Sequence, residues 1–330
     1  MSSNVATLPA ASRVTIDHQA RVAREQRAQW LAMAGAVLVL VGIVAAILKP
    51  ELWSPYGLIL FCAGLLAATV GLVVRYTPKM FAIMRRELAS FFLSPIAYMV
   101  IFGILVVAAF NFRLLLYDLA SGAMAFTQVE DPVVNYMGNI WLLFCLIFVV
   151  PVVTMRLLSE ERRSGTIEAL MSAPVTEAEV VLGKFVAGLV FYMAVWIPWL
   201  LFLFVLRWWG KVEFTFWPVA SMYLGLLTLG TTFIAGGLLF SSLTRNQIIA
   251  AILAFAMMMA LLVIVVLQYY MQQGGEAEGK VEAMRYASFF LQMRDFAQGK
   301  LDVRYVAMHL SAAGFLLFVT TRVLESRKWQ

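Results

Sequence analysis

The sequence predicts an all-α integral membrane protein that crosses the bilayer about eight times. Of its 330 residues, 62% are hydrophobic and 13% are charged, and the mean hydropathy is +0.86. Soluble domains have roughly 25% charged residues, so too few polar side chains remain here to cover a soluble core of this size. The chain also contains several apolar runs of about 20 residues, the length at which a helix spans a bilayer.

Eight apolar runs are separated by polar segments, and each is expected to form one transmembrane helix. They lie near 31–48, 56–75, 96–117, 136–157, 180–206, 217–241, 247–270 and 304–322. The composition changes near residue 76, between the second and third runs. We therefore expect a cytoplasmic tail (1–29), an additional N-terminal transmembrane hairpin (30–78) and a six-span body (79–330).

Basic residues indicate which side of the membrane the loops occupy. With eight spans both termini share one side, and that side holds sixteen of the 25 Lys and Arg residues. Cytoplasmic loops carry such an excess of Lys and Arg. The sequence thus predicts a multi-pass protein of the plasma (inner) membrane with both termini cytoplasmic. The basic residues flank apolar runs and form no stripe, so the net charge of +6 does not indicate a nucleic-acid partner.

Residues 79–94 are predicted to form a short amphipathic helix along the inner membrane surface. Apolar residues recur at helical spacing on one face, and Arg86 falls on the opposite face. Such a helix lies in the lipid interface, and it should end at Ser94, because the residue before Pro95 is driven away from helical dihedrals. The alternative is a polar linker between spans. The residues expected to act in this interfacial helix are Met80, Met84, Arg85, Arg86, Leu88 and Phe91.

The loop 158–183 is predicted to form a rigid elbow on the cytoplasmic side. A charged run, Glu160 to Arg163, is followed by Gly165-Thr166 and then by a helix-compatible stretch that Pro174 ends. The apolar residues Ile167, Leu170 and Met171 share one face of that stretch and favour docking of a partner. The alternative is an ordinary solvated loop.

A new helix is expected to begin at Thr176. Thr176-x-x-Glu179 is a capping box, in which each side chain accepts a hydrogen bond from the other residue's backbone N–H. Val175 and Val180 occupy the positions of a hydrophobic staple, which fixes the angle at which the chain enters the helix. Lys184, one turn further on, is expected to extend back to the membrane interface. A third cytoplasmic element is the tight turn around Thr244, Arg245 and Asn246.

Catalytic and metal-binding motifs are absent from the sequence. It has no phosphate-binding loop, no His/Cys metal cluster and no nucleophile turn. Cys62 and Cys145 lie within apolar runs, and His309 is a lone histidine in the last span. No acidic residue lies deep in a span, whereas ion-coupled carriers usually need one. We therefore predict no enzymatic activity and no catalytic, cofactor or metal site in this chain.

Several motifs together resemble the permeases of ABC-2 type transporters. The segment from Arg156 to Glu168, with Ala173 to Thr176 and Gly183-Lys184, is similar to the coupling loop of that family. Arg86-Glu87-Leu88, the Ser241–Gln247 turn and the C-terminal Arg322–Trp329 also match it, in family order. The likeness covers about 80–330 and is greatest to the gliding-motility-associated branch, which also resembles copper-enzyme maturation permeases. Gln292-Met293 replace an expected His-Phe pair, and residues 1–78 lie outside the resemblance.

The resemblance implies a permease subunit of an ABC transporter, an exporter of an unidentified substrate. ATP and Mg²⁺ would bind a separate ATP-binding subunit, and a second permease copy or a paralogous permease, together with membrane lipid, would complete the complex. The residues implied to dock the ATPase are Glu160, Glu161, Arg162, Arg163, Gly165, Thr166, Ile167, Glu168, Leu170 and Met171. The alternatives are a non-transporting membrane scaffold or regulator coupled to an ATPase, and a secondary carrier.

Overall fold

The computed structural model describes residues 79–121, 132–165, 175–212, 214, 216–273 and 286–326, and within these ranges all regular structure is helical. The all-α prediction is confirmed for this part of the chain. Two compact units are present, Met1–Phe81 and Ala82–Gln330, and the description below concerns the second. The two spans predicted near 31–48 and 56–75 lie outside the described residues.

Six helices in the described ranges are long and apolar enough to cross a membrane, and they correspond to the last six predicted runs. They are Pro95–Ala120, Ile140–Ser164, Glu177–Trp208, Trp217–Leu243, Gln247–Leu267 and Val303–Ser326. The individual elements are α3 (Pro95–Ala120), α5 (Pro132–Met137), α6 (Ile140–Thr154), α7 (Ser159–Ser164), α9 (Glu177–Val195), α10 (Ile197–Trp208), α11 (Phe216–Leu243), α12 (Gln247–Gln273), α14 (Phe289–Ala297) and α15 (Val303–Ser326).

The boundary between the 79–93 helix and α3 lies at the position that Pro95 predicts. Residues 79–93 are helical, Ser94 has extended dihedrals, and α3 begins at Pro95. Proline suits the first turn of a helix because its missing N–H would have no intrahelical partner there. The predicted end of the 79–94 helix is thus confirmed.

The predicted span 180–206 is not one continuous helix. It divides at Trp196 into α9 and α10, and Pro198 occupies the first turn of α10. A proline inside a helix removes one backbone hydrogen bond and clashes with the preceding turn. The two halves still form one candidate span, Glu177–Trp208, so the proline changes the shape of this span and leaves the number of spans unchanged.

α11 is the central helix of the described bundle. It contacts α15 most extensively and also touches α6, α9, α12 and α14. In its most apolar stretch 72% of residues are buried, against 17% in α12 and in α15. Gly237 of α11 lies so close to α6 that a Cβ placed on it would be 2.2 Å from Thr154 Oγ1. A small residue of this kind lets transmembrane helices approach closely.

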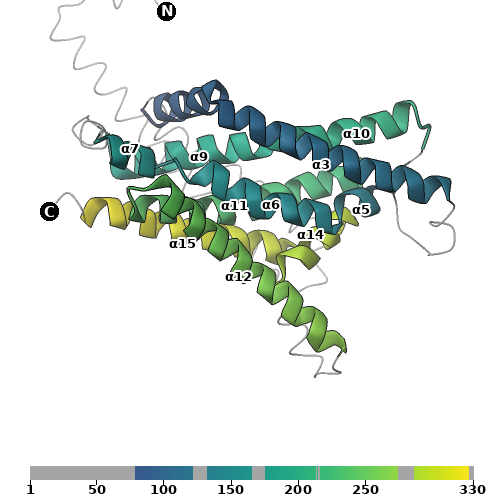
Figure 1. Cartoon of the computed structure of the whole chain (residues 1–330). Coiled ribbons are helices and arrows are strands. Elements are labelled where there is room, and N and C mark those ends of the chain that lie inside the picture. The colour runs from purple at the N-terminus through teal and green to yellow at the C-terminus, as the bar shows by residue number, and fades with distance from the viewer. Residues whose placement is uncertain are drawn as a thin grey trace, which may run out of the picture. The chain divides into compact units, whose positions relative to one another are not determined.

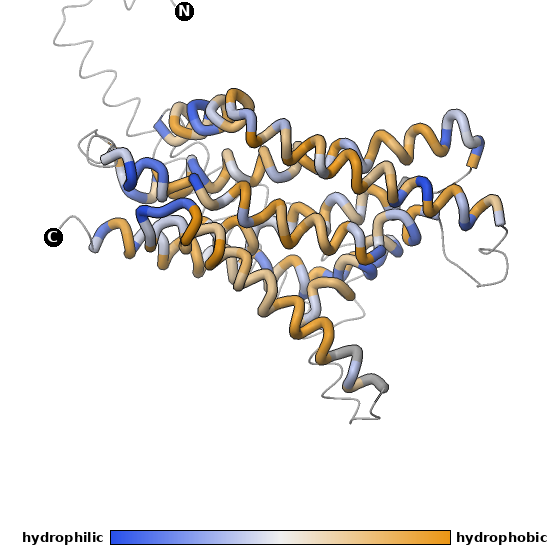
Figure 2. Tube along the Cα trace, viewed as in Figure 1, coloured by the Kyte–Doolittle hydropathy of each residue, from blue (hydrophilic) through white to orange (hydrophobic). Residues whose placement is uncertain are grey.

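The bundle has two distinct ends (Figure 1). One end, called the α7 end below, holds α7, the start of α9, the α11–α12 turn and the last turn of α15. The opposite end, called the far end, holds α5, the end of α10 and α14. Hydrophobic residues dominate the long helices between them, and hydrophilic residues gather toward the ends (Figure 2).

Candidate functional site

Lys184 lies at the centre of a buried ion cluster at the α7 end. Its side chain is 1% exposed, and its Nζ is 2.8 Å from Glu87 Oε1 and 3.1 Å from Glu161 Oε1. Arg86 completes the cluster, with Nη2 2.7 Å from Glu161 Oε1 and 3.3 Å from Glu87 Oε1. Two members belong to the 79–93 helix, one to α7 and one to α9. The cluster therefore ties these three helices together.

The position of Lys184 corrects the expectation that its ammonium would extend to the membrane interface. A lysine reaches water when no counter-ion is available within the protein. Here two carboxylates neutralise the charge where it lies, so the side chain stays inside. Glu161, predicted to face the ATPase, is largely buried and occupied in the same cluster, with 12% of its side chain exposed. Because Glu161 pairs with Lys184 and Arg86 of neighbouring helices, it is suited to positioning α7.

An aromatic contact joins the 79–93 helix to α9 beside the ion cluster. The rings of Phe91 and Phe191 are stacked, with centroids 4.6 Å apart and planes at 8°. Arg156 places its guanidinium carbon 4.4 Å from the Phe91 ring centroid and donates a hydrogen bond to Ser90 Oγ at 3.0 Å. Phe91, expected to contact lipid, is instead buried against protein, whereas Leu93 is 84% exposed.

Ser241 fixes the start of α7 from the end of α11. Its Oγ accepts hydrogen bonds from the backbone N–H groups of Leu158 and Ser159, both at 3.0 Å, and donates to the Met155 carbonyl at 3.2 Å. Arg162 donates to the carbonyl of Ser242. The first N–H groups of a helix have no intrahelical partners, and a side chain from a different span supplies them here. Any movement of α7 must therefore be accompanied by the α7 end of α11.

The capping box predicted at the start of α9 is present. Thr176 Oγ1 accepts a hydrogen bond from Glu179 N at 3.3 Å, and Glu179 Oε2 accepts one from Thr176 N at 2.7 Å. On the other side of the loop, α7 ends at Gly165, which has a φ of 71°. A left-handed residue that ends a helix is usually glycine, because glycine has no Cβ to clash. The predicted elbow is thus bounded by two defined helix ends.

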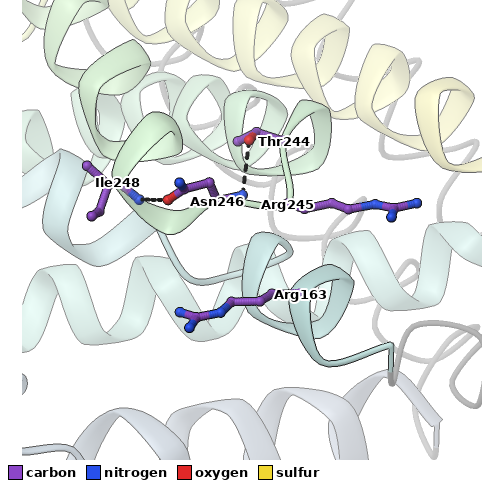
Figure 3. Close-up of a pocket in the computed structure, with 5 residues that line it drawn as sticks. All are labelled: Arg163, Thr244, Arg245, Asn246 and Ile248. Atoms are coloured by element: carbon purple, nitrogen blue, oxygen red, sulfur yellow. Dashed lines mark hydrogen bonds between the residues drawn. The ribbon is translucent and has the colours of Figure 1, made fainter.

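A pocket of about 520 Å³ opens between α7 and the α11–α12 turn (Figure 3). Its lining comprises Arg163, Thr244, Arg245, Asn246 and Ile248. Asn246 is held in place by two hydrogen bonds, one from its N–H to Thr244 Oγ1 and one from Ile248 N to its Oδ1. The two guanidinium groups extend in different directions, one from α7 and one from the turn. Two of the predicted elements therefore share one basic surface.

The remaining predicted residues are distributed unevenly. The segment predicted as a short docking helix, with Thr166, Ile167, Glu168, Leu170 and Met171, lies outside the described residues. In α7, Glu160 and the following Gly165 are exposed. In the 79–93 helix, Arg85 is exposed, whereas Met84 and Leu88 are half-buried. At the predicted hydrophobic staple, Val175 is half-buried and Val180 is buried. Met80 belongs to the other compact unit. No group of three or more His, Cys, Asp or Glu residues that could hold a metal ion occurs among the described residues.

The residues that hold the α7 end together were hard to predict from the sequence. Glu87, Ser241 and Arg156 each contact an element more than 65 positions away in the chain. Glu87 was visible only as a member of the Arg86-Glu87-Leu88 motif, and its partner could not be read from spacing. Because Lys184 lies near the start of a predicted span, it was expected to reach the membrane interface, and its ion pairs with Glu87 and Glu161 were not predicted.

The comparison with known families identifies the body of the protein. Residues 115–291, more than half of the chain, match the model of the ABC-2 family transporter proteins. The chain belongs to the ABC-2 family of transporters. The match begins in α3 and ends in α14, so it includes α7, α9 and the α11–α12 turn. No curated protein matches the chain.

Membership in the ABC-2 family assigns the general role of the chain. It is a multi-pass membrane protein and a permease subunit of an ABC transporter, and the family implies a partnership with an ABC ATP-binding subunit. The domain that matches is a membrane component and not a catalytic one.

The capping box provides a test of how rigid the elbow must be. Thr176→Ala is expected to lower the local stability of the first turn of α9 by about 0.5–2 kcal/mol, because one N–H of that turn loses its acceptor. Hydrogen exchange of the Glu179 amide should accelerate accordingly. Thr176→Ser keeps the hydroxyl and should exchange like the wild type. Equal exchange in the Ala and Ser variants would show that the cap contributes nothing.

Proposed function

We propose that this ABC-2 permease is the membrane subunit of a plasma-membrane exporter and that its α7 end receives motion from a separate ATP-binding subunit. The observation that carries this proposal is the ion cluster in which the buried Lys184 and the largely buried Glu87 and Glu161 meet the more exposed Arg86. It connects α7 and α9 to the 79–93 helix, which precedes the first span of the body. A solvated loop would need no such connection.

The contacts at the α7 end suit the transmission of a displacement. α7 is linked to α9 and to the 79–93 helix by the ion cluster, and to α11 by Ser241. A push on the loop that follows α7 would therefore move three long elements together. Packed elements with such discrete contacts shift as rigid bodies and do not absorb the displacement.

The surface proposed for docking combines α7 with the pocket between α7 and the α11–α12 turn, together with the residues that follow α7 in the sequence. Glu160 and Arg163 are exposed on α7, and Arg245 and Asn246 are exposed on the adjoining turn. The apolar residues expected to enter the ATPase groove follow Gly165 in the sequence. ATP and Mg²⁺ are assigned to the partner, and a second permease, either a copy or a paralogue, would complete the translocation path. The motifs around Arg86 support a place in the gliding-motility-associated branch.

A charge exchange on α7 tests the docking proposal. Glu160→Lys combined with Arg163→Glu reverses exposed charges and leaves the ion cluster intact, so the permease should fold but lose its ATP-binding subunit during purification. The matched control is Arg113→Glu with Asp118→Lys on α3, toward the far end, which should retain the subunit. Undiminished co-purification of the α7 variant would refute docking at this surface. A bound subunit whose ATP hydrolysis the permease never stimulates would indicate a scaffold.

The proposed cytoplasmic position of both termini can be tested separately. Single cysteines at Ser3 and Ser326, in a chain whose Cys62 and Cys145 are replaced by alanine, should resist a membrane-impermeant maleimide in intact cells. Both should react once the cells are permeabilised. Labelling of the two positions in intact cells would reverse the proposed orientation and with it the assignment of the α7 end to the cytoplasm.

A further inference from the structure

The pocket between α7 and the α11–α12 turn lies at the level expected for lipid headgroups. Arg163 is the residue before the end of the candidate span Ile140–Ser164, and Arg245 lies two residues before the candidate span that begins at Gln247. Residues at the end of a span lie in the interface between water and hydrocarbon. Two different spans therefore bring an arginine to the same pocket at the membrane surface.

The polar groups that line the pocket are mostly free hydrogen-bond donors. Thr244 Oγ1 accepts a hydrogen bond from Asn246 N at 3.0 Å, and Asn246 Oδ1 accepts one from Ile248 N at 2.9 Å. These bonds engage the two side-chain acceptors and leave the Thr244 hydroxyl proton and the Asn246 amide protons available. Neither Arg163 nor Arg245 forms an ion pair or hydrogen bond with another described residue. No acidic side chain is among the described residues of the lining, so the pocket complements an anion.

One wall of the pocket continues into an apolar surface along α12. Ile248 belongs to the lining and is 68% exposed, and Ile252, one turn further along the helix, is 60% exposed. Val263 and Leu267 are also exposed and lie on the same side of α12. Positive charge at the start of a span, followed by apolar surface along it, matches the two parts of a phospholipid, its phosphate and its acyl chains.

An arginine at the end of a span is by itself ordinary, because basic residues gather on the cytoplasmic side of a membrane protein. Arg163 and Arg245 differ in lying on separate elements around one pocket. Its volume of about 520 Å³ is within the range of ligand pockets, roughly 300–1,000 Å³. The two guanidinium groups extend in different directions (Figure 3). Because no described residue holds either of them, each can turn toward a bound phosphate.

We propose that this pocket binds the phosphate of an anionic phospholipid, with Arg163 and Arg245 as its ligands and the acyl chains along the exposed side of α12. Arginine can form two parallel hydrogen bonds to a phosphate. A soluble acidic segment would match the arginines but would leave the apolar side of α12 unused.

The bound lipid would lie in the cytoplasmic leaflet, which is rich in anionic lipids. This part of the inference rests on the proposed function, because the proposed orientation places the α7 end on the cytoplasmic side. The pocket also belongs to the proposed docking surface. The lipid would therefore lie where the ATP-binding subunit meets the membrane.

Native mass spectrometry of the full-length permease, delipidated in detergent and titrated with defined lipids, measures this binding. Dioleoylphosphatidylglycerol, which has a net negative charge, should bind about tenfold more tightly than dioleoylphosphatidylcholine, because hydrogen bonds to a charged group contribute more than 1 kcal/mol each. Both lipids have the same acyl chains. Equal affinity for the two would overturn the proposal.

Substitution of the two arginines locates the site. Arg163→Gln with Arg245→Gln should weaken binding of dioleoylphosphatidylglycerol about tenfold or more, with an unchanged melting temperature because both side chains are exposed and unpaired. The matched control is Arg85→Gln with Arg113→Gln, which removes the same charge from exposed positions outside the pocket. The control should bind the lipid as the wild type does. An equal loss in both double variants would indicate attraction to net charge alone and would refute the site.

Soluble competitors separate a lipid from other anions. Inorganic phosphate carries the charge without acyl chains, and a short polyglutamate peptide represents an acidic protein segment. Neither should displace dioleoylphosphatidylglycerol at an equal concentration. Displacement by phosphate would identify a site for free phosphate, and displacement by the peptide would identify a protein-docking site. Either result would overturn the assignment to a lipid.

Glu160→Lys distinguishes failure of this inference from failure of the proposed function. Glu160 is exposed on α7 and is not part of the pocket lining. The variant should lower recovery of the ATP-binding subunit and should bind dioleoylphosphatidylglycerol at least as tightly as the wild type. If the subunit is lost but the wild type shows no preference for the anionic lipid, the lipid site is wrong and docking at α7 stands. If the subunit is retained and the lipid depends on the two arginines, docking at Glu160 is wrong and the lipid site stands.

Discussion

Replacing Lys184 with methionine is expected to separate the 79–93 helix from α7 and to abolish co-purification of the ATP-binding subunit. Without the ammonium, the carboxylates of Glu87 and Glu161 face each other with only Arg86 to neutralise them, and 58% of that side chain is exposed. Removing one partner of a buried ion pair costs about 3–5 kcal/mol, because the remaining charge stays buried without compensation. This is a large fraction of the stability of a typical domain.

The measurement is the melting temperature of the permease in nanodiscs together with recovery of the ATP-binding subunit. Arg85→Gln removes one exposed positive charge from the same region and serves as the control, which should match the wild type in both respects. Adding Glu161→Gln and Glu87→Gln to the methionine variant removes the uncompensated charges and should recover much of the lost stability. A methionine variant as stable as the wild type would show that the cluster does not hold the three helices together.

Gly237→Val is expected to force α11 and α6 apart and to reduce the yield of folded protein severely. The added side chain would overlap Thr154, whose Oγ1, Cβ and Cγ2 all lie within 2.6 Å of an ideal Cβ at this position. Thr154 cannot turn aside freely, since its hydroxyl donates to the Val150 carbonyl at 2.9 Å. Overpacking costs about 1–3 kcal/mol and sometimes more, and Ser241 lies only one turn further along α11.

The matched control for this substitution is Gly103→Val on α3, where a Cβ would meet nothing within 4 Å. It should leave the amount of folded protein and its melting temperature close to those of the wild type. In the double variant Gly237→Ala with Thr154→Gly, the side chain at this contact is supplied by α11 and the glycine by α6, so close packing should be restored. Equal yields from Gly237→Val and Gly103→Val would contradict the close approach of α11 to α6.

Lys184 and Gly237 both help to hold α7 in place. Lys184 joins the loop elements to α9, and Gly237 sets the position of α11, which carries Ser241 to the start of α7. A defect at either site should loosen α7 while leaving α14 and the far end of the bundle in place. Labelling of a cysteine introduced at Met293, which is 1% exposed, offers a direct check, because this position should stay protected in both variants.

Features that depend on neighbouring residues in the chain could be predicted from the sequence. The apolar runs located the six described spans, since crossing a bilayer requires a continuous length of helix. Pro95 marked the start of α3, and the spacing of Thr176 and Glu179 predicted the capping box. The division at Trp196 was missed although Pro198 was visible, because an apolar run alone does not show whether its helix is continuous.

Contacts between distant segments were decided only by the tertiary structure. Nothing in the sequence pairs Lys184 with Glu87, 97 positions away, or His309 with Gln292 and Thr232. Phe91 and Leu93 look equally suited to lipid, yet one stacks on Phe191 and the other is exposed. Hydropathy and helix capping act within one segment, so the amino-acid pattern alone predicted a helical membrane protein and the capping box at the start of α9. Which polar groups meet inside the bundle depends on how the helices pack, because a buried charge or amide is satisfied by whatever partner the fold places beside it.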